Sequence, residues 1–163
     1  KFKYYKVKNK DFDSLLNKVD IIPPSLAIAQ AAYESGWGTS RFALEGNSLF
    51  GQRTWASTSG IVPLERGQDQ TFKVTKFDII RASVKAYKKN LNTHKSYEKL
   101  RLERKKMRAE GKEISGIKLS QHLDKYSEIK DKYVIYLQKI IEQNSLTDFD
   151  KSILLPTKKI NLA

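Results

Sequence analysis

The chain has 163 residues, of which 39% are hydrophobic and 30% are charged, and its formal net charge is +13. This length and composition predict one soluble globular domain over residues 1–163, long enough to bury its own core. The absence of cysteine excludes disulfides, catalytic thiolates and zinc–thiolate sites, and the presence of only two histidines argues against a histidine-rich metal site.

No apolar run approaches the ~20 residues that a membrane-spanning helix needs. The N-terminus, KFKYYKVKNKDF, also lacks the apolar segment of a signal peptide. The sequence therefore predicts neither a membrane span nor a signal peptide in this chain.

The positive charge is concentrated in the middle of the chain. Residues 73–139 contain 19 Lys and Arg against 8 Asp and Glu, whereas residues 1–72 contain 9 against 7. Such a basic region indicates a polyanionic partner, for example nucleic acid, anionic lipid headgroups or an anionic cell-wall polymer. The alternative is a lysine-rich helical face that is only solvated.

The first half of the chain is predicted to be helical. Asp11 and Asp13 are suitable caps for a short helix that ends near Val19. The prolines at 23–24 end that segment. Ser25 is the expected N-cap of a helix over 26–35, which Gly36 ends. A further short helix is expected after Thr39 or Ser40, followed by a turn over 45–48.

The second half begins with residues 52–78, which hold Thr, Ser, Gly, Pro and Val and alternate over 71–77. This pattern predicts a β-hairpin with its turn near 66–69. Asp78 is the expected N-cap of a helix over 79–93. Further helices are expected over 95–110, 120–123 and about 127–143, and the tail from 145 is ambiguous. The predicted fold class is α+β, a mainly helical domain with one small β-hairpin.

Glu34 is the one carboxylate that follows the apolar segment Leu26 to Tyr33, and the turn Gly36-Trp37-Gly38 comes directly after it. An ionised carboxylate is costly to bury unpaired. Glu34 is therefore expected either to have a structural ion-pair partner or to be held protonated. A protonated carboxyl group near neutral pH is what general acid catalysis needs.

The neighbouring residues suggest a cleft that binds sugars. Trp37 offers an aromatic wall, and the segment Asn47 to Gly51 supplies amide donors beside Phe50. The hairpin, which carries Glu65 and Asp69, is a candidate for the opposite wall. Aromatic rings, amides and one acid suit sugar rings, which present apolar faces and hydroxyl edges.

The same residues carry a resemblance to a known family. The segment I-A-Q-A-A-Y-E-S-G-W-G at 28–38, followed by N-S-L-F-G at 47–51, resembles the glucosaminidase family of bacterial peptidoglycan hydrolases. The segments over 74–91 and 126–141 resemble the family's hairpin-to-helix segment and its final helix. The Asn92-Thr93-His94 step and GIVP at 60–63 resemble the Bax-type subgroup of Gram-negative bacteria. The resemblance covers about 12–143 and implies a lysozyme-like fold.

The resemblance implies roles for particular residues. Glu34 corresponds to the catalytic acid, and Tyr126 to a tyrosine that contacts the N-acetyl sugar. Asn47, Phe50 and Gly51 correspond to the sugar-binding turn. Trp37 is expected to pack beneath the helix, with sugar contact as the alternative. Many members have a second glutamate early in the hairpin; here the first hairpin carboxylate is Glu65, a candidate catalytic base that is also compatible with a solvated hairpin tip.

The resemblance implies an endo-β-N-acetylglucosaminidase that hydrolyses the β-1,4 bond of peptidoglycan glycan strands. Glu34 would donate a proton to the leaving oxygen. Either Glu65 activates water, or the substrate's own 2-acetamido group attacks while Tyr126 orients it; the second is favoured. The alternatives are a lytic transglycosylase and a non-catalytic module that binds glycan or nucleic acid.

The expected partners follow from this reading. They are peptidoglycan strands, with the basic region 73–139 contacting anionic cell-wall polymer, and not nucleic acid. A monomer is expected in the bacterial cell envelope, and neither a cofactor nor a metal is expected.

Overall fold

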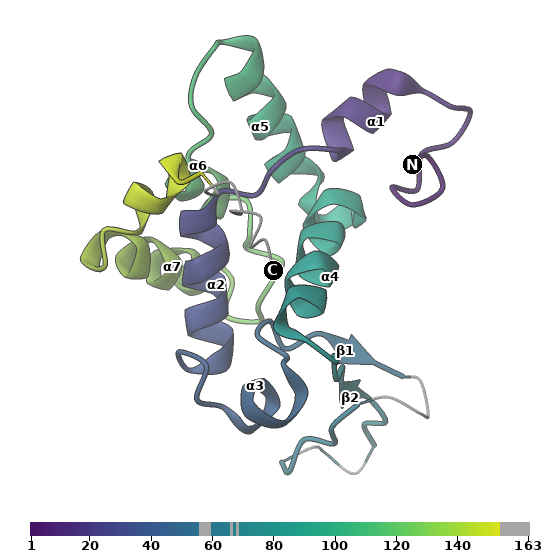
Figure 1. Cartoon of the computed structure of the whole chain (residues 1–163), viewed down its shortest axis with the longest axis vertical. Helices are drawn as coiled ribbons and strands as arrows, with labels where there is room; N and C mark the ends of the chain where they lie inside the picture. The colour runs from purple at the N-terminus through teal and green to yellow at the C-terminus, as the bar shows by residue number, and fades with distance from the viewer. Residues whose placement is uncertain (56–59, 66, 68, 154–163) are drawn as a thin grey trace, which may run out of the picture.

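The computed structural model describes residues 1–55, 60–65, 67 and 69–153, and it is mainly helical with one small antiparallel sheet (Figure 1). This confirms the predicted fold class. None of the helices in these ranges is long and apolar enough to cross a membrane. In chain order the elements are α1 (Phe12–Lys18), α2 (Pro24–Ser35), α3 (Arg41–Gly46), β1 (Arg53–Thr54), β2 (Lys73–Val74), α4 (Ile80–Thr93), the 3-10 helix η1 (Lys95–Tyr97), α5 (Glu98–Ala109), α6 (Gly116–Ser120), α7 (Asp131–Gln143) and the 3-10 helix η2 (Leu146–Lys151).

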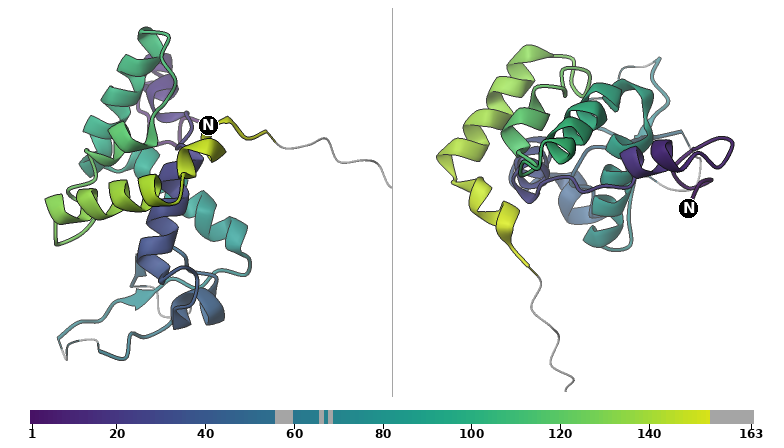
Figure 2. Two further views of the ribbon diagram at one scale, coloured as in Figure 1. Left: turned by 90° about the vertical axis from the view of Figure 1, so that its left-hand side faces the viewer. Right: turned by 90° about the horizontal axis from the view of Figure 1, so that it is seen from above.

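Helix α2 is the centre of the packing, since it contacts α6, α7 and η2. Figure 2 shows α7 crossing α2 on one side, while α5 and the two-stranded sheet lie at opposite ends of the molecule. Leu26 and Ala29 of α2 are fully buried, as are Leu137 and Ile141 of α7. Burying such side chains is the main stabilising contribution to a core of this kind. The residue that ends this apolar surface of α2 is Glu34.

Several predicted helix boundaries are confirmed and others are wrong. Asp11 caps α1, Ser40 caps α3, and Gly36 ends α2 in the left-handed conformation, with φ 56°. Ser25 is not a cap: α2 begins at Pro24, a residue with fixed φ and no N–H to leave unpaired. The Ser25 hydroxyl instead donates to Asp150 of η2 at 2.7 Å.

The later boundaries were also misplaced. Asp78 does not cap α4, because Ile79 occupies the cap position without a side-chain hydrogen bond. Ser115 caps α6, so the short helix expected over 120–123 lies earlier, and α7 begins at Asp131 and not at 127. Only local cap chemistry guided these predictions, and the tertiary packing selected other residues.

The predicted hairpin is present, but it is short. Strands β1 and β2 pair antiparallel over two residues each, with Arg53 opposite Val74. Ile61 adds an isolated bridge to Val74. The turn was predicted near 66–69, and positions 66 and 68 of it lie outside the described residues.

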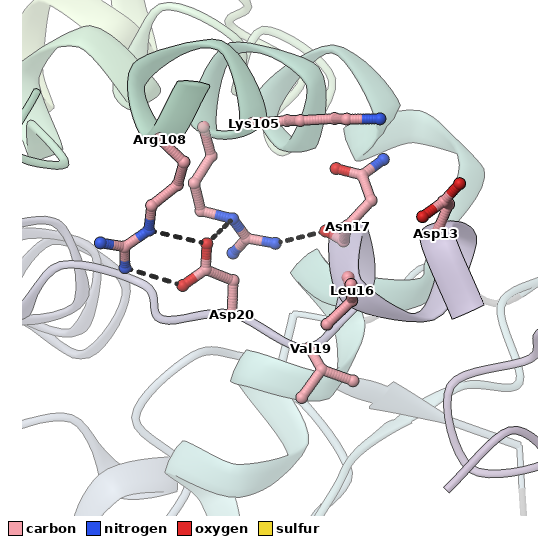
Figure 3. A pocket seen from close by; sticks show the side chains of 8 residues that line it. Asp13, Leu16, Asn17, Val19, Asp20, Lys105 and Arg108 are labelled. Carbon is pink, nitrogen blue, oxygen red and sulfur yellow. Dashed lines mark hydrogen bonds and ion pairs between the residues drawn. The ribbon is translucent and has the colours of Figure 1, made fainter. Parts of the chain in front are cut away.

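A buried arginine ties α5 to the segment that precedes α2. Arg104 is 1% exposed and donates to the carbonyl oxygens of Ile21 and Asn17 at 2.7 and 2.9 Å. It also contacts the Asp20 carboxylate at 3.5 Å beside Arg108, at the edge of a cavity of about 360 Å³ between α1 and α5 (Figure 3). Burial lowers the pKa of Arg104 to about 10, which leaves it charged at neutral pH.

We expect the Arg104→Met variant to lose about 3–5 kcal/mol of unfolding free energy, because the carbonyl oxygens of Ile21 and Asn17 and Oδ1 of Asn92 lose their donor, at about 1–3 kcal/mol for each buried group left unsatisfied. Urea denaturation of the variant measures this loss. The matched control is Lys105→Met on the exposed side of the same helix, expected to change stability by less than about 0.5 kcal/mol. A loss below about 1 kcal/mol in Arg104→Met would show that the buried contacts of Arg104 contribute little to the stability of the fold.

Candidate active site

Glu34 lies in the last turn of α2 and lines a groove of about 1120 Å³. The groove is bounded by residues from α2, the segment 50–55, α4, η1 and the loop before α7. The groove-lining residues are Glu34, Phe50, Gly51, Gln52, Arg53, Trp55, Asn90, His94, Tyr97, Asp124, Lys125, Tyr126, Ser127, Glu128, Ile129 and Lys130. The predicted acid therefore borders a space large enough for several sugar rings, since ligand pockets typically measure about 300–1,000 Å³.

The environment of Glu34 favours its protonated form. Burial raises the pKa of the Glu34 carboxyl group, and a hydrogen bond from Tyr133 opposes that rise without cancelling it. Among the ion pairs of the described residues, none includes Glu34. The structural ion pair, which the sequence left open as an alternative, is thus not found in this part of the chain.

Three buried side chains connect Glu34 to the core by hydrogen bonds. The Tyr133 hydroxyl of α7 donates to Oε1 of Glu34 at 2.8 Å. The Nε2 atom of Gln30 donates to the Tyr133 oxygen at 2.9 Å. The Tyr87 hydroxyl of α4 donates to Oε1 of Gln30 at 2.7 Å. Gln30, Tyr87 and Tyr133 are each at most 1% exposed, so this network is shielded from water.

Three predicted site residues lie beside Glu34 in the groove. The ring of Tyr126 is stacked on that of Tyr133 with centroids 5.6 Å apart, and its hydroxyl is 3.4 Å from the Phe50 carbonyl oxygen. The Phe50 ring is stacked on Tyr87 at 3.9 Å. Gly51 has a positive φ of 58°, and a Cβ atom built there would lie 3.8 Å from Oε2 of Glu34. This second carboxyl oxygen therefore faces the Gly51 side of the groove.

Two other predicted residues lie outside the groove lining. Asn47 is the left-handed C-cap of α3, and its side chain donates to the carbonyl oxygens of Phe77 and Asp78. Asn47 thus joins the end of the hairpin to α3. Trp37 is 59% exposed and has a positive φ of 58°, so the predicted packing beneath α2 is wrong.

The hairpin carboxylates are also outside the groove lining. Glu65 and Asp69 are both exposed and lie in turns on either side of position 67. The groove instead contains Asp124, which is half-buried, and Glu128, which is exposed. The structure therefore brings Glu34, Phe50, Gly51 and Tyr126 together, but it does not bring Glu65 to them.

Several groove residues were missed from the sequence. Asp124 directly precedes the Lys125-Tyr126 pair, so its closeness to Tyr126 was the available signal. Gln52 lines the groove, and its buried Oε1 atom has no hydrogen-bond donor among the described residues. Such an acceptor is suited to an N–H or O–H group of a ligand. Tyr133, which donates to Glu34 without lining the groove, lies 99 positions from it along the chain.

A metal centre has no support in the described part of the chain. No group of three or more His, Cys, Asp and Glu residues there is arranged to hold an ion. The groove contains one histidine, His94, whose Nδ1 accepts a hydrogen bond from the backbone N–H of Ser96. The chemistry that this arrangement offers is proton transfer by Glu34.

Comparison with known proteins gives one family and one curated relative. The sequence model of the family Glucosaminidase, described as mannosyl-glycoprotein endo-beta-N-acetylglucosaminidase, matches residues 9–146. The chain is 35% identical over 149 residues to Protein bax of Escherichia coli (strain K12), covering 87% of this chain and 52% of that protein. The chain thus spans about half the length of this curated relative. No solved structure was found to match.

Proposed function

The chain belongs to the glucosaminidase family, and from this membership we propose that it hydrolyses the β-1,4 glycosidic bond that follows N-acetylglucosamine in peptidoglycan glycan strands. Membership places the chain among glycan-cleaving enzymes, and the bond, the mechanism and the substrate are the parts proposed. The observation that carries the proposal is Glu34, a groove carboxyl group whose pKa burial raises and whose hydrogen-bond partner is a neutral tyrosine.

Glu34 acts as the general acid in the proposed reaction. It donates its proton to the glycosidic oxygen as the bond to the anomeric carbon lengthens and an oxocarbenium-like state develops. The raised pKa keeps a fraction of Glu34 protonated at a pH where an ordinary glutamate is ionised. Positioning this acid in a groove next to aromatic rings is what a sugar substrate requires.

The nucleophile in the proposal is the 2-acetamido oxygen of the substrate. Glu65 and Asp69 of the hairpin are not among the described residues that line the groove, whereas Tyr126 and Gln52 offer a hydroxyl group and a buried carbonyl acceptor. Gln52 is suited to accept a hydrogen bond from the amide N–H of the acetamido group, and Tyr126 is suited to orient its oxygen. The half-buried Asp124 is the carboxylate available to stabilise the positive charge that develops.

The basic residues of the groove suit an anionic polymer. Arg53, Lys125 and Lys130 line it, and they can approach the stem-peptide carboxylates that hang from a peptidoglycan strand. We extend this to the wider region 73–139, which contacts anionic wall polymer in our proposal. The cell envelope is the place where such a substrate occurs.

Mass spectrometry of fragments released from purified peptidoglycan tests the proposal. We expect new reducing ends on N-acetylglucosamine, and none when the Glu34→Gln variant is used. A 1,6-anhydro-muramic end would instead identify a lytic transglycosylase. Binding to peptidoglycan without release of any fragment would identify a non-catalytic module.

The Tyr126→Phe variant is expected to lower kcat by about tenfold or more, an effect in the range of a lost positioning contact, while the melting temperature changes little. Among the described residues its hydroxyl makes one long hydrogen bond, at 3.4 Å, so removal leaves the stacked ring in place. Turnover on a soluble glycan fragment and thermal unfolding measure the two effects. An unchanged kcat with unchanged or higher stability would assign Tyr126 to the core alone.

A further inference from the structure

The hydrogen bonds that lead from the core to Glu34 all run in one direction. Tyr87 donates to Gln30, and Gln30 in turn donates to Tyr133. Tyr133 then donates to Oε1 of Glu34. Gln30 and Tyr133 each accept one of these hydrogen bonds and donate the next. The direction of the first bond therefore determines the direction of the others.

Tyr87 is the group that fixes this direction. Its hydroxyl is fully buried between α4 and α2, and the hydrogen bond that it makes in the described part of the chain is the one to Oε1 of Gln30. Turning the Gln30 amide over would leave the buried Tyr87 hydrogen without an acceptor among the described residues, so the carbonyl oxygen of Gln30 stays toward Tyr87 and its NH₂ group toward Tyr133. A Tyr133 oxygen that already accepts from Gln30 directs its own hydrogen to Glu34.

The reversed network would place the acid's proton on the wrong side. If the Gln30 amide turned over, Tyr133 would donate to Gln30 and present its oxygen to Glu34 as an acceptor. A protonated Glu34 would then satisfy that acceptor with a proton on Oε1, inside the core. In the observed direction Oε1 is occupied as an acceptor, so the proton is left for Oε2, which faces Gly51 and the groove.

We propose that Tyr87 and Gln30 are positioning residues that set the hydrogen-bond direction so that Glu34 carries its acidic proton on Oε2, toward the substrate. The proposal rests on the proposed function only for its catalytic consequence. The placement of the proton is a property of the folded chain and is measurable without any turnover.

Other ionisable groups surround Glu34, and the Tyr87→Phe change leaves all of them in place. Four tyrosines interact with it electrostatically from different elements: Tyr33 on α2, Tyr97 on η1, Tyr126 before α7 and Tyr133 on α7. The remaining ionisable groups of the groove are Arg53, His94, Asp124, Lys125, Glu128 and Lys130. A shift in the titration of Glu34 that depends on Tyr87 therefore reports on the network.

The experiment is an NMR titration of the Glu34 side-chain carboxyl carbon in the intact 163-residue chain, with Glu34→Gln used to identify its signal. Tyr133→Phe removes a donor to the carboxylate and is expected to raise the Glu34 pKa by about 0.5–1 unit. Tyr87→Phe is also expected to raise it, because the protonated acid can then donate to Tyr133. In the Tyr87→Phe/Tyr133→Phe double variant we expect no rise beyond that of Tyr133→Phe alone.

The sign of the shift separates positioning from loosening of the core. A core that merely opened to water would relieve the burial of Glu34 and lower its pKa. The Tyr87→Phe change keeps the ring that stacks on Phe50. Tyr136→Phe on α7, whose ring stacks on Tyr33 and is 44% exposed, is the matched control and should leave the Glu34 titration unchanged.

Enzyme kinetics supply the second measurement. In Tyr87→Phe we expect kcat to fall about tenfold at the pH of maximal rate, within the range of general acid catalysis, while the high-pH limb of kcat/KM moves upward. An unchanged or lowered Glu34 pKa in Tyr87→Phe would overturn the proposal. So would a double variant in which Tyr87→Phe raises the Glu34 pKa above that of Tyr133→Phe by as much as it does in the parent chain. If the NMR shifts appear as expected but no variant or parent chain cleaves peptidoglycan, the network stands and the proposed function fails.

Discussion

Replacement of Glu34 by glutamine is expected to lower turnover by about 10²–10⁴-fold, the usual contribution of general acid catalysis. The side chains have nearly the same shape, so the packing of α2 is preserved. Tyr133 can still donate to the amide oxygen in place of Oε1. The amide NH₂ group, however, cannot supply a proton of useful acidity to the leaving oxygen.

The rate of the unsubstituted chain should show the same group in its pH dependence. Because burial raises the Glu34 pKa, the protonated fraction, and with it kcat/KM, declines only at a pH above the ordinary glutamate value of 4.5. Glu142→Gln, at an exposed position of α7, is the matched control and should retain full activity. A folded Glu34→Gln chain with more than about a tenth of the parent rate would disprove the assignment.

Local sequence signals predicted the part of the site that is contiguous in the chain. The apolar segment before Glu34 predicted α2, and Gly36 predicted its end, because a left-handed residue that stops a helix favours glycine. Phe50 and Gly51 follow within the same short segment and do line the groove. The role of each of these residues in catalysis stays a prediction.

Long-range contacts explain what the sequence did not show. Gln30 meets Tyr87 and Tyr133 from 57 and 103 positions away, and spacing along one chain gives no sign of such a meeting. Asn47 has the polar side chain expected of a sugar-binding turn, but its amide holds the hairpin to α3. Trp37 is an aromatic residue next to a buried helix, but the left-handed turn after α2 leaves its ring mostly exposed.

After Glu34, the carboxylate whose replacement is expected to lower kcat most is Asp124. We expect Asp124→Asn to lower kcat by about 10²–10³-fold, comparable to removal of one preorganised electrostatic group. In the proposed reaction the acetamido oxygen attacks the anomeric carbon, and positive charge builds on the sugar ring and the acetamido nitrogen. Asp124 is the half-buried carboxylate that shares the groove with Glu34 and directly precedes the loop of Tyr126.

Glu65→Ala is the paired variant and is expected to retain most of the parent rate, because Glu65 is exposed in a turn and is not among the groove-lining residues. Turnover of both variants on the same glycan fragment, with thermal unfolding to confirm that each is folded, measures the difference.

A thiazoline mimic of the oxazoline intermediate should inhibit the parent chain, because that intermediate forms only when the acetamido group attacks. If Glu65→Ala instead lost about a thousandfold, well beyond the usual effect of a surface substitution, and added azide restored turnover, water activated by Glu65 would be the nucleophile. The hairpin would then have to close over the groove during the reaction, since the structure leaves Glu65 outside it.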